Sequence, residues 1–345
     1  MGKGTKMLTS QVTLRDIASR TGYSVTTVSK ALRNHPDIPA KTQQSIIQTA
    51  KDMGYVVNTM ASALRSGYTR SLALIVSDIS NPLFGIICKE IESYAAKHEY
   101  SIIIYNTDEQ ENNELKAIEN AISKSVDGIL LTPCQTSNAS LELLAQYKKP
   151  CVLIGRYFDD YPMDAILFDD ENGGYLAGKH LIEQGFKNII MLNAPGNSSA
   201  RDRSRGFQQA IQEDSSVKGH VIEATSALCG VNDVALNECI DTHFDALFAY
   251  SDLIALEAVS ILKKQGRYSH NIGIIGYDDI VSDFTIPFSL SSISFSKKEL
   301  GIELIDLLLK RIQGDYSDFP CQKNVTANLV IRDSTIPISS SQIYP

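Results

Sequence analysis

The sequence has no tryptophan, no long apolar run and no paired cysteine motif. A membrane-spanning helix needs about 18 consecutive apolar residues, and no such run occurs. The opening residues, MGKGTKMLTSQ, contain no apolar segment of the kind found in secretory signals, so we expect a cytoplasmic protein. The six cysteines are scattered without a CxxC pair, which favours reduced, mostly buried thiols over disulfides.

Motifs that would indicate an enzyme are also missing. Residues 173–180, GGYLAGKH, approach the P-loop pattern, but they end in His180 where a hydroxyl for Mg²⁺ is needed, and we expect them to lie in mid-helix. No G-x-S-x-G occurs, and the six histidines show no metal-ligand spacing. The neighbouring Asp278 and Asp279 would point apart in an extended segment. We therefore expect no enzymatic activity, no metal site and no cofactor.

The net charge of −8 is divided unevenly along the chain. Residues 1–65 hold nine Lys or Arg and three Asp or Glu, a balance of +6, so the remaining residues carry −14. A small basic part attached to a larger acidic part suggests that the small part binds a polyanion and that the large part does not.

The basic part contains the pattern of a helix-turn-helix in TLRDIASRTGYSVTTVSK, residues 13–30. Thr13 and Ser24 are helix-capping types, and Gly22 tolerates the positive φ of a tight turn. Ala18 is small enough for the two helices to approach, and Val28 fills their crossing. In such motifs the second helix enters the DNA major groove.

We expect this part of the chain, residues 12–57, to bind DNA, and residues 58–67 to form a short linking helix. A third helix is predicted from about residue 40 to 53, and Asn58 can cap the short helix that follows it. That helix is covered by small side chains and carries Leu64, a shape that suits the minor groove. The predicted DNA-contacting residues are Thr13, Ser24, Val25, Thr26, Ser29, Lys30, Asn58, Ala61 and Leu64.

From residue 71 onward, apolar strands alternate with helices, which predicts parallel sheets with helices on both faces. There are too many strands for one sheet, so we expect two α/β lobes with a cleft. The predicted first lobe comprises residues 71–168 and 296–323, and the second comprises residues 169–293 and 326–345. Ligands of such sheets bind at the carboxyl ends of the strands.

VTLRDIASRTGYSVTTVSKAL and the linker after it resemble the lactose-repressor/galactose-repressor (LacI/GalR) family of transcriptional regulators, and the similarity continues to the last strand. The resemblance implies a ligand-responsive repressor of sugar-metabolism genes that binds a palindromic operator as a dimer. It also implies a periplasmic-binding-protein-like core and a hinge helix at residues 58–65. The chain departs from the family at Val57, where proline is common, and at Gly155, where some members carry an acidic effector ligand.

Polar side chains at the predicted strand ends suit a polyhydroxylated ligand. The family resemblance implies effector contacts for Arg203, Asp278 and Phe84. Arg156 would add positive potential that suits a phosphate, so the expected effector is a sugar or phosphosugar. The predicted effector-binding residues are Phe84, Arg156, Ser199, Arg203, Ser251 and Asp278.

Several alternatives stay open at the level of the sequence. The same architecture could sense a purine or a protein coeffector, or it could belong to a sugar-binding protein with no DNA role. Apolar helical faces at 83–97 and 290–312 could pair two subunits, and the end of the chain, SSSQIYP, shows no heptad repeat, which favours a dimer over a tetramer. Whether a ligand would strengthen or weaken DNA binding depends on which state it prefers, and the sequence does not indicate this.

Overall fold

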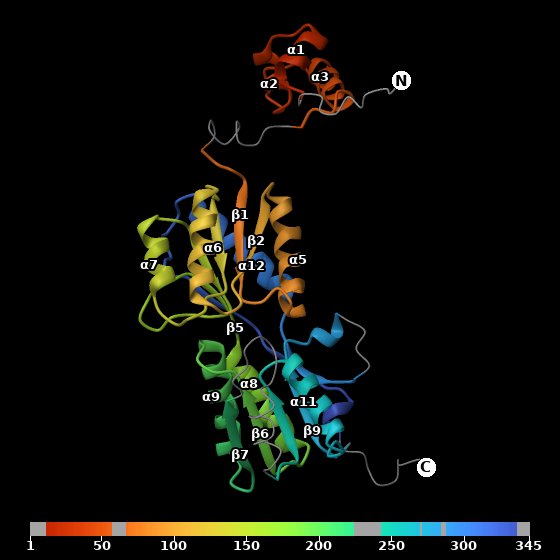
Figure 1. Ribbon diagram of the computed structural model, residues 1–345, viewed down its shortest axis with the longest axis vertical. Helices are drawn as coiled ribbons and strands as arrows, with labels where there is room; N and C mark the ends of the chain where they lie inside the picture. Colours follow the sequence, from red (N-terminus) through yellow and green to blue (C-terminus); the bar gives the residue numbers. More distant parts are fainter. Residues whose placement is uncertain (1–11, 57–66, 224–242, 270, 284–287, 337–345) are drawn as a thin grey trace, which may run out of the picture. The chain divides into compact units, whose positions relative to one another are not determined.

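The computed structural model describes residues 12–56, 67–223, 243–269, 271–283 and 288–336. It divides into two compact units, Met1–Gly67 and Tyr68–Pro345 (Figure 1). Each unit has its own apolar core. The predicted hinge contacts Asn58, Ala61 and Leu64, together with Val57, lie outside the described residues.

Within residues 12–56, the first unit is a cluster of three short helices: α1 (Leu14–Thr21), α2 (Val25–Ala31) and α3 (Ala40–Asp52). They share a small core formed by Ile17, Ala18, Val28, Ala31, Ile46 and Ala50. Helices this short are marginal in isolation, so their mutual packing supplies most of the stability of the unit.

The predicted caps of this unit are confirmed. Thr13 forms a capping box with Asp16, whose Oδ2 accepts from the Thr13 backbone N–H at 2.8 Å. Gly22 ends α1 in the left-handed conformation at φ 75°, and the Ser24 hydroxyl caps α2 by accepting from the Thr27 N–H at 3.0 Å. These local devices set the turn between α1 and α2 and thereby the direction of α2.

The described residues of the second unit form two six-stranded sheets, and the first of them is parallel throughout in the order β11-β5-β4-β3-β1-β2. Its strands are β1 (Ser71–Val76), β2 (Ser101–Asn106), β3 (Gly128–Leu131), β4 (Cys151–Ile154), β5 (Ala165–Phe168) and β11 (Gln322–Val325). Its helices are α5 (Pro82–Lys97), α6 (Glu111–Ser123), α7 (Ala139–Gln146) and α12 (Lys297–Ile312). Alternate residues of β1 pack into two different cores, with α5 and α12 on one face and α6 and α7 on the other.

The second sheet has the order β12-β10-β9-β8-β6-β7, and β12 alone runs antiparallel to its neighbour. Its strands are β6 (Asn188–Asn193), β7 (Lys218–Glu223), β8 (Ala246–Ala249), β9 (Gly273–Tyr277), β10 (Ser291–Ser294) and β12 (Asn328–Val330). Helices α8 (Asp170–Glu183) and α9 (Ser198–Gln212) cover one face, and α11 (Asp252–Lys264) covers the other. Two short 3₁₀ turns of the described chain, Ile280–Ser282 and Asp333–Thr335, follow β9 and β12.

Helices α8 and α9 cross at very close range because glycines face each other's backbone. A Cβ at Gly174 would lie 2.0 Å from the carbonyl oxygen of Arg203, and a Cβ at Gly206 would lie 1.8 Å from that of Glu171. The close crossing fixes the position of the α9 backbone at Arg203, and therefore the point from which the Arg203 side chain extends. The near match to a P-loop lies inside α8, as expected, and not in a phosphate-binding turn.

The structure adds one helix to those expected from the sequence. Helix α7 was not predicted, and β11 ends at Val325, between the expected end of the first lobe's last segment and the start of the second lobe's. Helices α5 and α12 pack against each other in one core inside the subunit, but both keep partly exposed apolar residues, such as Ile86 and Ile302, so their role in pairing two subunits stays a prediction. None of the described helices is long and apolar enough to span a bilayer.

Candidate functional site

Helix α2 of the first unit presents a polar surface to solvent. Val25 is 41 % exposed, Thr26 is also exposed, and Ser29 and Lys30 are partly exposed. Val28 and Ala31 of the same helix are buried against α1 and α3. The predicted contact residues therefore share the solvent-facing side of the helix, which is the side expected to contact DNA.

Two of the charged groups at this surface are engaged in local contacts. The ammonium of Lys30 pairs with Asp37 at 3.0 Å, and Arg33 donates to the backbone oxygen of Ser29 at 3.0 Å. The Lys30 hydrogen bond lowers the pKa of Asp37. Since the pair is exposed, it is weak and can exchange for a contact to DNA. Tyr23, 39 % exposed just before α2, was not singled out from the sequence.

In the second unit, a cavity of about 350 Å³ lies where the carboxyl ends of the parallel strands meet. The lining comes from both sheets, through the residues that follow β1, β3 and β4 on one side and β6, β8 and β9 on the other. All the predicted effector-binding residues line it: Phe84, Arg156, Ser199, Arg203, Ser251 and Asp278. These residues come from distant parts of the sequence, and the structure brings them to one place.

Arg203 is 2 % exposed and is held on several sides. Its Nε donates to Asp170 at 2.7 Å, its Nη1 donates to the backbone oxygen of Tyr250, and its Cζ lies 3.5 Å from the ring centroid of Tyr277. Burial by itself would lower the pKa of the Arg203 guanidinium. The charge of Asp170 and other neighbouring groups raise this pKa by a larger amount, so the net shift is upward. Arg203 is therefore a fixed, charged donor whose charge is balanced by Asp170.

Asp278 follows β9 and is 4 % exposed. Among the described residues, its Oδ1 has no hydrogen-bond partner. Asp278 and Asp279 both have positive φ, at 99° and 51°, which is unusual for residues with side chains. Burial raises the pKa of Asp278 to about 7, against the opposing charge of Arg203. A buried carboxyl oxygen without a partner in a cavity wall is suited to accept a hydrogen bond from a ligand.

Arg156 does not present a free positive charge to the cavity, contrary to the expectation from the sequence. Its two Nη atoms donate to the carboxylate of Glu109 at 2.9 and 2.6 Å, and Nη1 also donates to the backbone oxygen of Pro133. Glu109 lines the same cavity. The glycine at 155 has a local cause, because its φ is 69° and a Cβ there would lie 2.3 Å from the ring of Phe168.

The remaining lining residues have identifiable tasks. Ser199 donates to the backbone oxygen of Gly155 at 2.8 Å, and the Ser251 hydroxyl caps α11. Phe168, stacked on Phe295 with centroids 4.5 Å apart, adds an apolar wall near Phe84. Thr132 was missed from the sequence, yet its buried Oγ1 has no partner within the described ranges.

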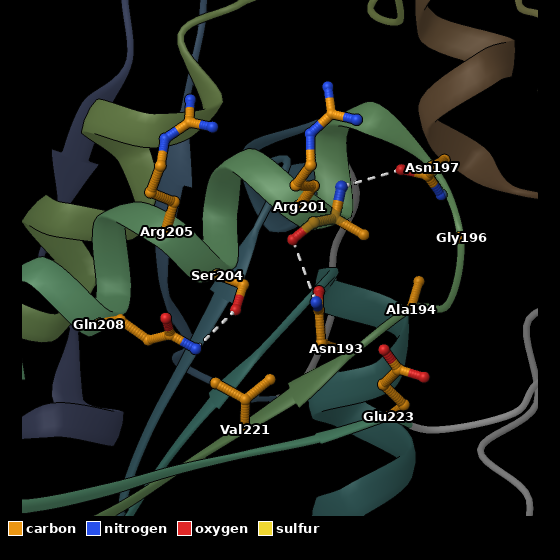
Figure 2. Close-up of a pocket in the computed structure, with 11 residues that line it drawn as sticks. Asn193, Ala194, Gly196, Asn197, Arg201, Ser204, Arg205, Gln208, Val221 and Glu223 are labelled. Carbon is orange, nitrogen blue, oxygen red and sulfur yellow. Dashed lines mark hydrogen bonds between the residues drawn. The ribbon is translucent and has the colours of Figure 1, made fainter.

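A second hollow of about 710 Å³ lies beside α9 and β7, lined by Asn193, Ser204, Gln208, Val221 and Glu223 among others (Figure 2). The stems of Arg201 and Arg205 border it, but both side chains leave α9 on the side away from Val221 and Glu223 (Figure 2). It lacks the convergence of both sheets that marks the smaller cavity, which we take as the candidate ligand site.

The described part of the chain contains no cluster of His, Cys, Asp or Glu that could hold a metal ion. Its cysteines, Cys88, Cys134, Cys151 and Cys321, are free thiols. Burial raises the pKa of Cys88 to about 11, so this thiol is unreactive at neutral pH.

Comparison with known proteins agrees with this architecture. Residues 69–340 match the periplasmic binding proteins and sugar binding domain of the LacI family, and residues 13–58 match the bacterial regulatory proteins of the lacI family. The chain is 31% identical to the HTH-type transcriptional regulator DegA of Bacillus subtilis, over 96% of this chain and 100% of the relative. It is 29% identical to the ribose operon repressor of Halalkalibacterium halodurans, over 94% and 97% of the two chains. The lac repressor dimer bound to operator and an anti-inducer shares the fold, with a TM-score of 0.78 and 24% identity over 95% of this chain and 100% of that one.

Proposed function

The chain belongs to the LacI family of bacterial regulatory proteins, and from this premise we propose that the cavity between its sheets binds the effector that controls its attachment to operator DNA. The protein is a DNA-binding transcriptional regulator and not an enzyme. The observation that carries the proposal is the convergence of Phe84, Arg156, Ser199, Arg203, Ser251 and Asp278 on one cavity.

We further propose that the effector is a neutral, polyhydroxylated molecule rather than a phosphosugar. Both guanidinium groups of the cavity are compensated, Arg156 by Glu109 and Arg203 by Asp170. The buried side-chain atoms of the lining that lack partners among the described residues, Asp278 Oδ1 and Thr132 Oγ1, are oxygens. A ligand with several hydroxyl groups can donate to these oxygens, whereas a phosphate would meet carboxylates and, among the described lining residues, no uncompensated cation.

For the first unit, we propose that α2 lies in the major groove and that two subunits place their α2 helices on the two halves of a palindromic operator. The exposure of Val25, Thr26 and Lys30 on one side of a well-capped helix supports this arrangement. The hinge contacts expected at Asn58, Ala61 and Leu64 are part of the proposal. Sedimentation at micromolar concentration should show a dimer with or without operator.

The experiment that tests the effector proposal is a thermal-shift screen against neutral sugars, sugar phosphates and nucleobases. A ligand that binds the folded state raises the melting temperature by mass action. The decisive variant is Asp278→Asn, with Asp252→Asn as its matched control. Both residues are buried acids with raised pKa values, but only Asp278 lines the cavity.

We expect neutral sugars to stabilise the wild type and Asp252→Asn, and to have little effect on Asp278→Asn. A hit that survives Asp278→Asn and Arg203→Ala would refute the cavity assignment. A hit confined to sugar phosphates would refute the charge argument, and a hit confined to nucleobases would establish the purine alternative. If no small molecule shifts the melting temperature, a protein coeffector becomes the better explanation.

A further inference from the structure

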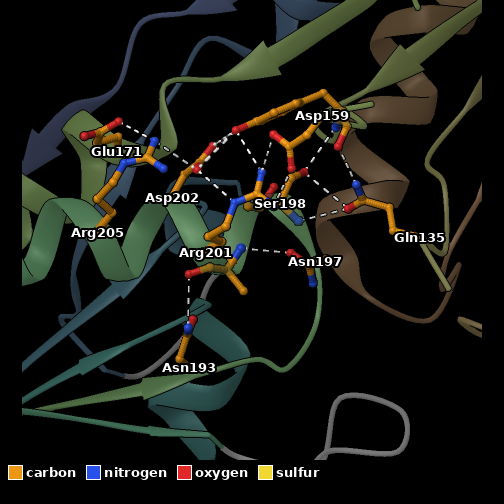
Figure 3. Close-up of polar contacts among 12 residues, drawn as sticks. Gln135, Asp159, Glu171, Asn193, Asn197, Ser198, Arg201, Asp202 and Arg205 are labelled. Carbon is orange, nitrogen blue, oxygen red and sulfur yellow. Dashed lines mark hydrogen bonds and ion pairs between the residues drawn. The ribbon is translucent and has the colours of Figure 1, made fainter. Parts of the chain in front are cut away.

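A polar network joins the two lobes at the rim of the effector cavity (Figure 3). It connects residues that follow β3 and β4 in the first lobe to the first turns of α9 in the second lobe. The function described above does not require it, because these contacts lie between protein groups alone.

The outer part of the network is centred on the hydroxyl of Tyr157. This hydroxyl donates to Asp202 of α9 at 3.0 Å and accepts from Nη2 of Arg201 at 3.0 Å. Arg201 also pairs with Asp159 at 2.9 Å and lies over the Tyr157 ring, with its Cζ 5.4 Å from the centroid. The Arg201–Asp159 pair is exposed and weak by itself, but it fixes the guanidinium that the tyrosine accepts from.

The inner part is centred on Ser198, the first residue of α9. Its backbone N–H donates to Oε1 of Gln135 at 2.9 Å, and its hydroxyl accepts from the Tyr157 N–H at 3.1 Å. Gln135 in turn donates to the backbone oxygen of Tyr157. The first N–H groups of a helix have no partner within the helix, so the other lobe satisfies this one.

The network reaches the effector cavity directly. Gln135 lines the cavity, and so does the next residue of α9, Ser199, whose hydroxyl donates across to Gly155. A ligand in the cavity would therefore contact the same segments that hold the lobes together.

We propose that Gln135, Tyr157, Asp159, Ser198, Arg201 and Asp202 form an inter-lobe latch that keeps the lobes closed in the absence of ligand and thereby sets the effector affinity. Only the second part of this proposal, the effect on effector affinity, rests on the proposed function. If the ligand contacts both lobes, the closed form is the one that binds, and the apparent affinity scales with its population. The latch raises that population without touching the ligand.

The test compares Tyr157→Phe and Arg201→Gln with Arg205→Gln. Tyr157→Phe keeps the ring and removes both hydroxyl hydrogen bonds. Arg205 lies one turn further along α9 and is about as exposed as Arg201, but its partners Glu171 and Asp202 both belong to the second lobe. Arg205→Gln therefore removes an arginine of the same helix without removing an inter-lobe contact.

The first measurement is amide hydrogen exchange in the free full-length protein. The N–H groups of Ser198 and Tyr157 both donate across the lobes, so their exchange reports opening of the latch. We expect exchange there to accelerate on the order of three- to ten-fold in Tyr157→Phe and Arg201→Gln, the effect of losing one or two hydrogen bonds, while Arg205→Gln matches the wild type. Exchange in β1 should not change in any variant, which separates opening from unfolding. Wild-type rates at both amides in the latch variants would overturn the proposal.

The second measurement is the affinity for a neutral sugar identified in the screen. Because the affinity falls only as the closed population falls, we expect a smaller loss than in exchange, about two- to three-fold in the two latch variants, with the affinity of Arg205→Gln equal to that of the wild type. Faster exchange with unchanged affinity would overturn the link between latch and effector. If no sugar binds, the proposed effector function fails, and the exchange measurement still decides whether the latch exists.

Discussion

Asp278 combines three features that are unfavourable for stability. It is buried, its Oδ1 lacks a partner among the described residues, and its backbone is left-handed. Strained backbone and unpaired buried polar atoms persist where a function requires them. Asp252 lies nearby, and burial, with the charge of Asp278, raises the pKa of Asp252 to about 8. The two acids therefore titrate as a coupled pair near neutral pH.

This pair makes the stability of the protein depend on pH. The folded-state pKa of Asp278, about 7, lies above the unfolded value near 4, so its favourable contribution is fully present below about pH 4 and is lost as the pH rises through 7. We expect Asp278→Asn to be more stable than the wild type at pH 8, by on the order of 2 kcal/mol, and to keep only a small part of this advantage at pH 4.5. Urea unfolding at both pH values measures this difference. A variant less stable than the wild type at pH 8 would show that the carboxylate has an unrecognised partner.

On the DNA side, Lys30 and Lys41 differ in the role expected of them. Lys30 lies on the solvent-facing side of α2, whereas Lys41 is exposed in the first turn of α3. We expect Lys30→Ala to lose about 1–3 kcal/mol of discrimination at one base pair, and Lys41→Ala to weaken binding to all sequences alike. Titrations on the operator and its single-base variants at fixed salt distinguish the two. Equal losses on operator and random DNA in both variants would place the reading face elsewhere.

For single residues, the sequence predicts which side chains lie at a strand end, but not which distant residues they contact. Arg156 was recognised as a cavity residue because it follows an apolar strand, but its partner Glu109 is 47 residues away in sequence. Nothing local to Arg156 indicates that its charge is compensated, so the expected positive potential was wrong. Thr132 was missed for a similar reason, because a single hydroxyl after a strand is common.

At the scale of elements, the crossing of α8 and α9 positions the effector-contacting end of α9. The carbonyl oxygens of Arg203 and Glu171 occupy the space that side chains at Gly174 and Gly206 would need. Backbone atoms cannot move aside as flexible side chains can. The separation of these helices is therefore set by the two glycines and not by the apolar residues around them.

Gly206→Ala should push α9 away from α8. We expect a loss of about 1–3 kcal/mol or more in the free energy of unfolding, because the new methyl group meets backbone. The matched control is Gly85→Ala in α5, where a Cβ meets no atom within 4 Å. That change should stabilise the protein by about 0.5–1 kcal/mol by restricting the unfolded chain. Chemical denaturation of both variants gives the comparison, and a neutral Gly206→Ala would mean that the helices can separate freely.

Elements with strong local signals were predictable and the others were not. Thr13, Gly22 and Ser24 are capping and turn residues that act on their own neighbours, so α1 and α2 could be placed from sequence. Strand β11 carries the letters QKNV and is exposed along most of its length, so no apolar pattern marks it. It is a strand because β5 offers a free edge, which is a tertiary cause.

At the scale of the whole molecule, charge separates the two units. The basic part contains the three-helix unit, and the acidic remainder contains both sheets. An acidic body repels DNA except where the basic unit contacts it, which favours operator binding through that unit alone. Affinity for DNA should therefore decrease steeply with salt concentration.

A protein consisting of residues 68–345 should bind the effector as the full chain does and should lose operator binding. Every described residue that lines the cavity belongs to this unit, and its cores are separate from that of the three helices. Calorimetry with an effector from the screen should give the same affinity for both proteins, within about two-fold. A large loss of effector affinity in residues 68–345 would show that the first unit contributes to the cavity.

The order in which the chain supplies its two sheets determines which apolar surface is exposed during synthesis. The first sheet starts at residue 71, yet its outer strand β11 and its covering helix α12 come from residues 297–325. On the ribosome, the apolar face of β3 and β4 emerges long before α12 can cover it. The lobe that begins first is therefore completed only when nearly the whole chain has been made, and until then that face is open to chaperones, proteases and other nascent chains.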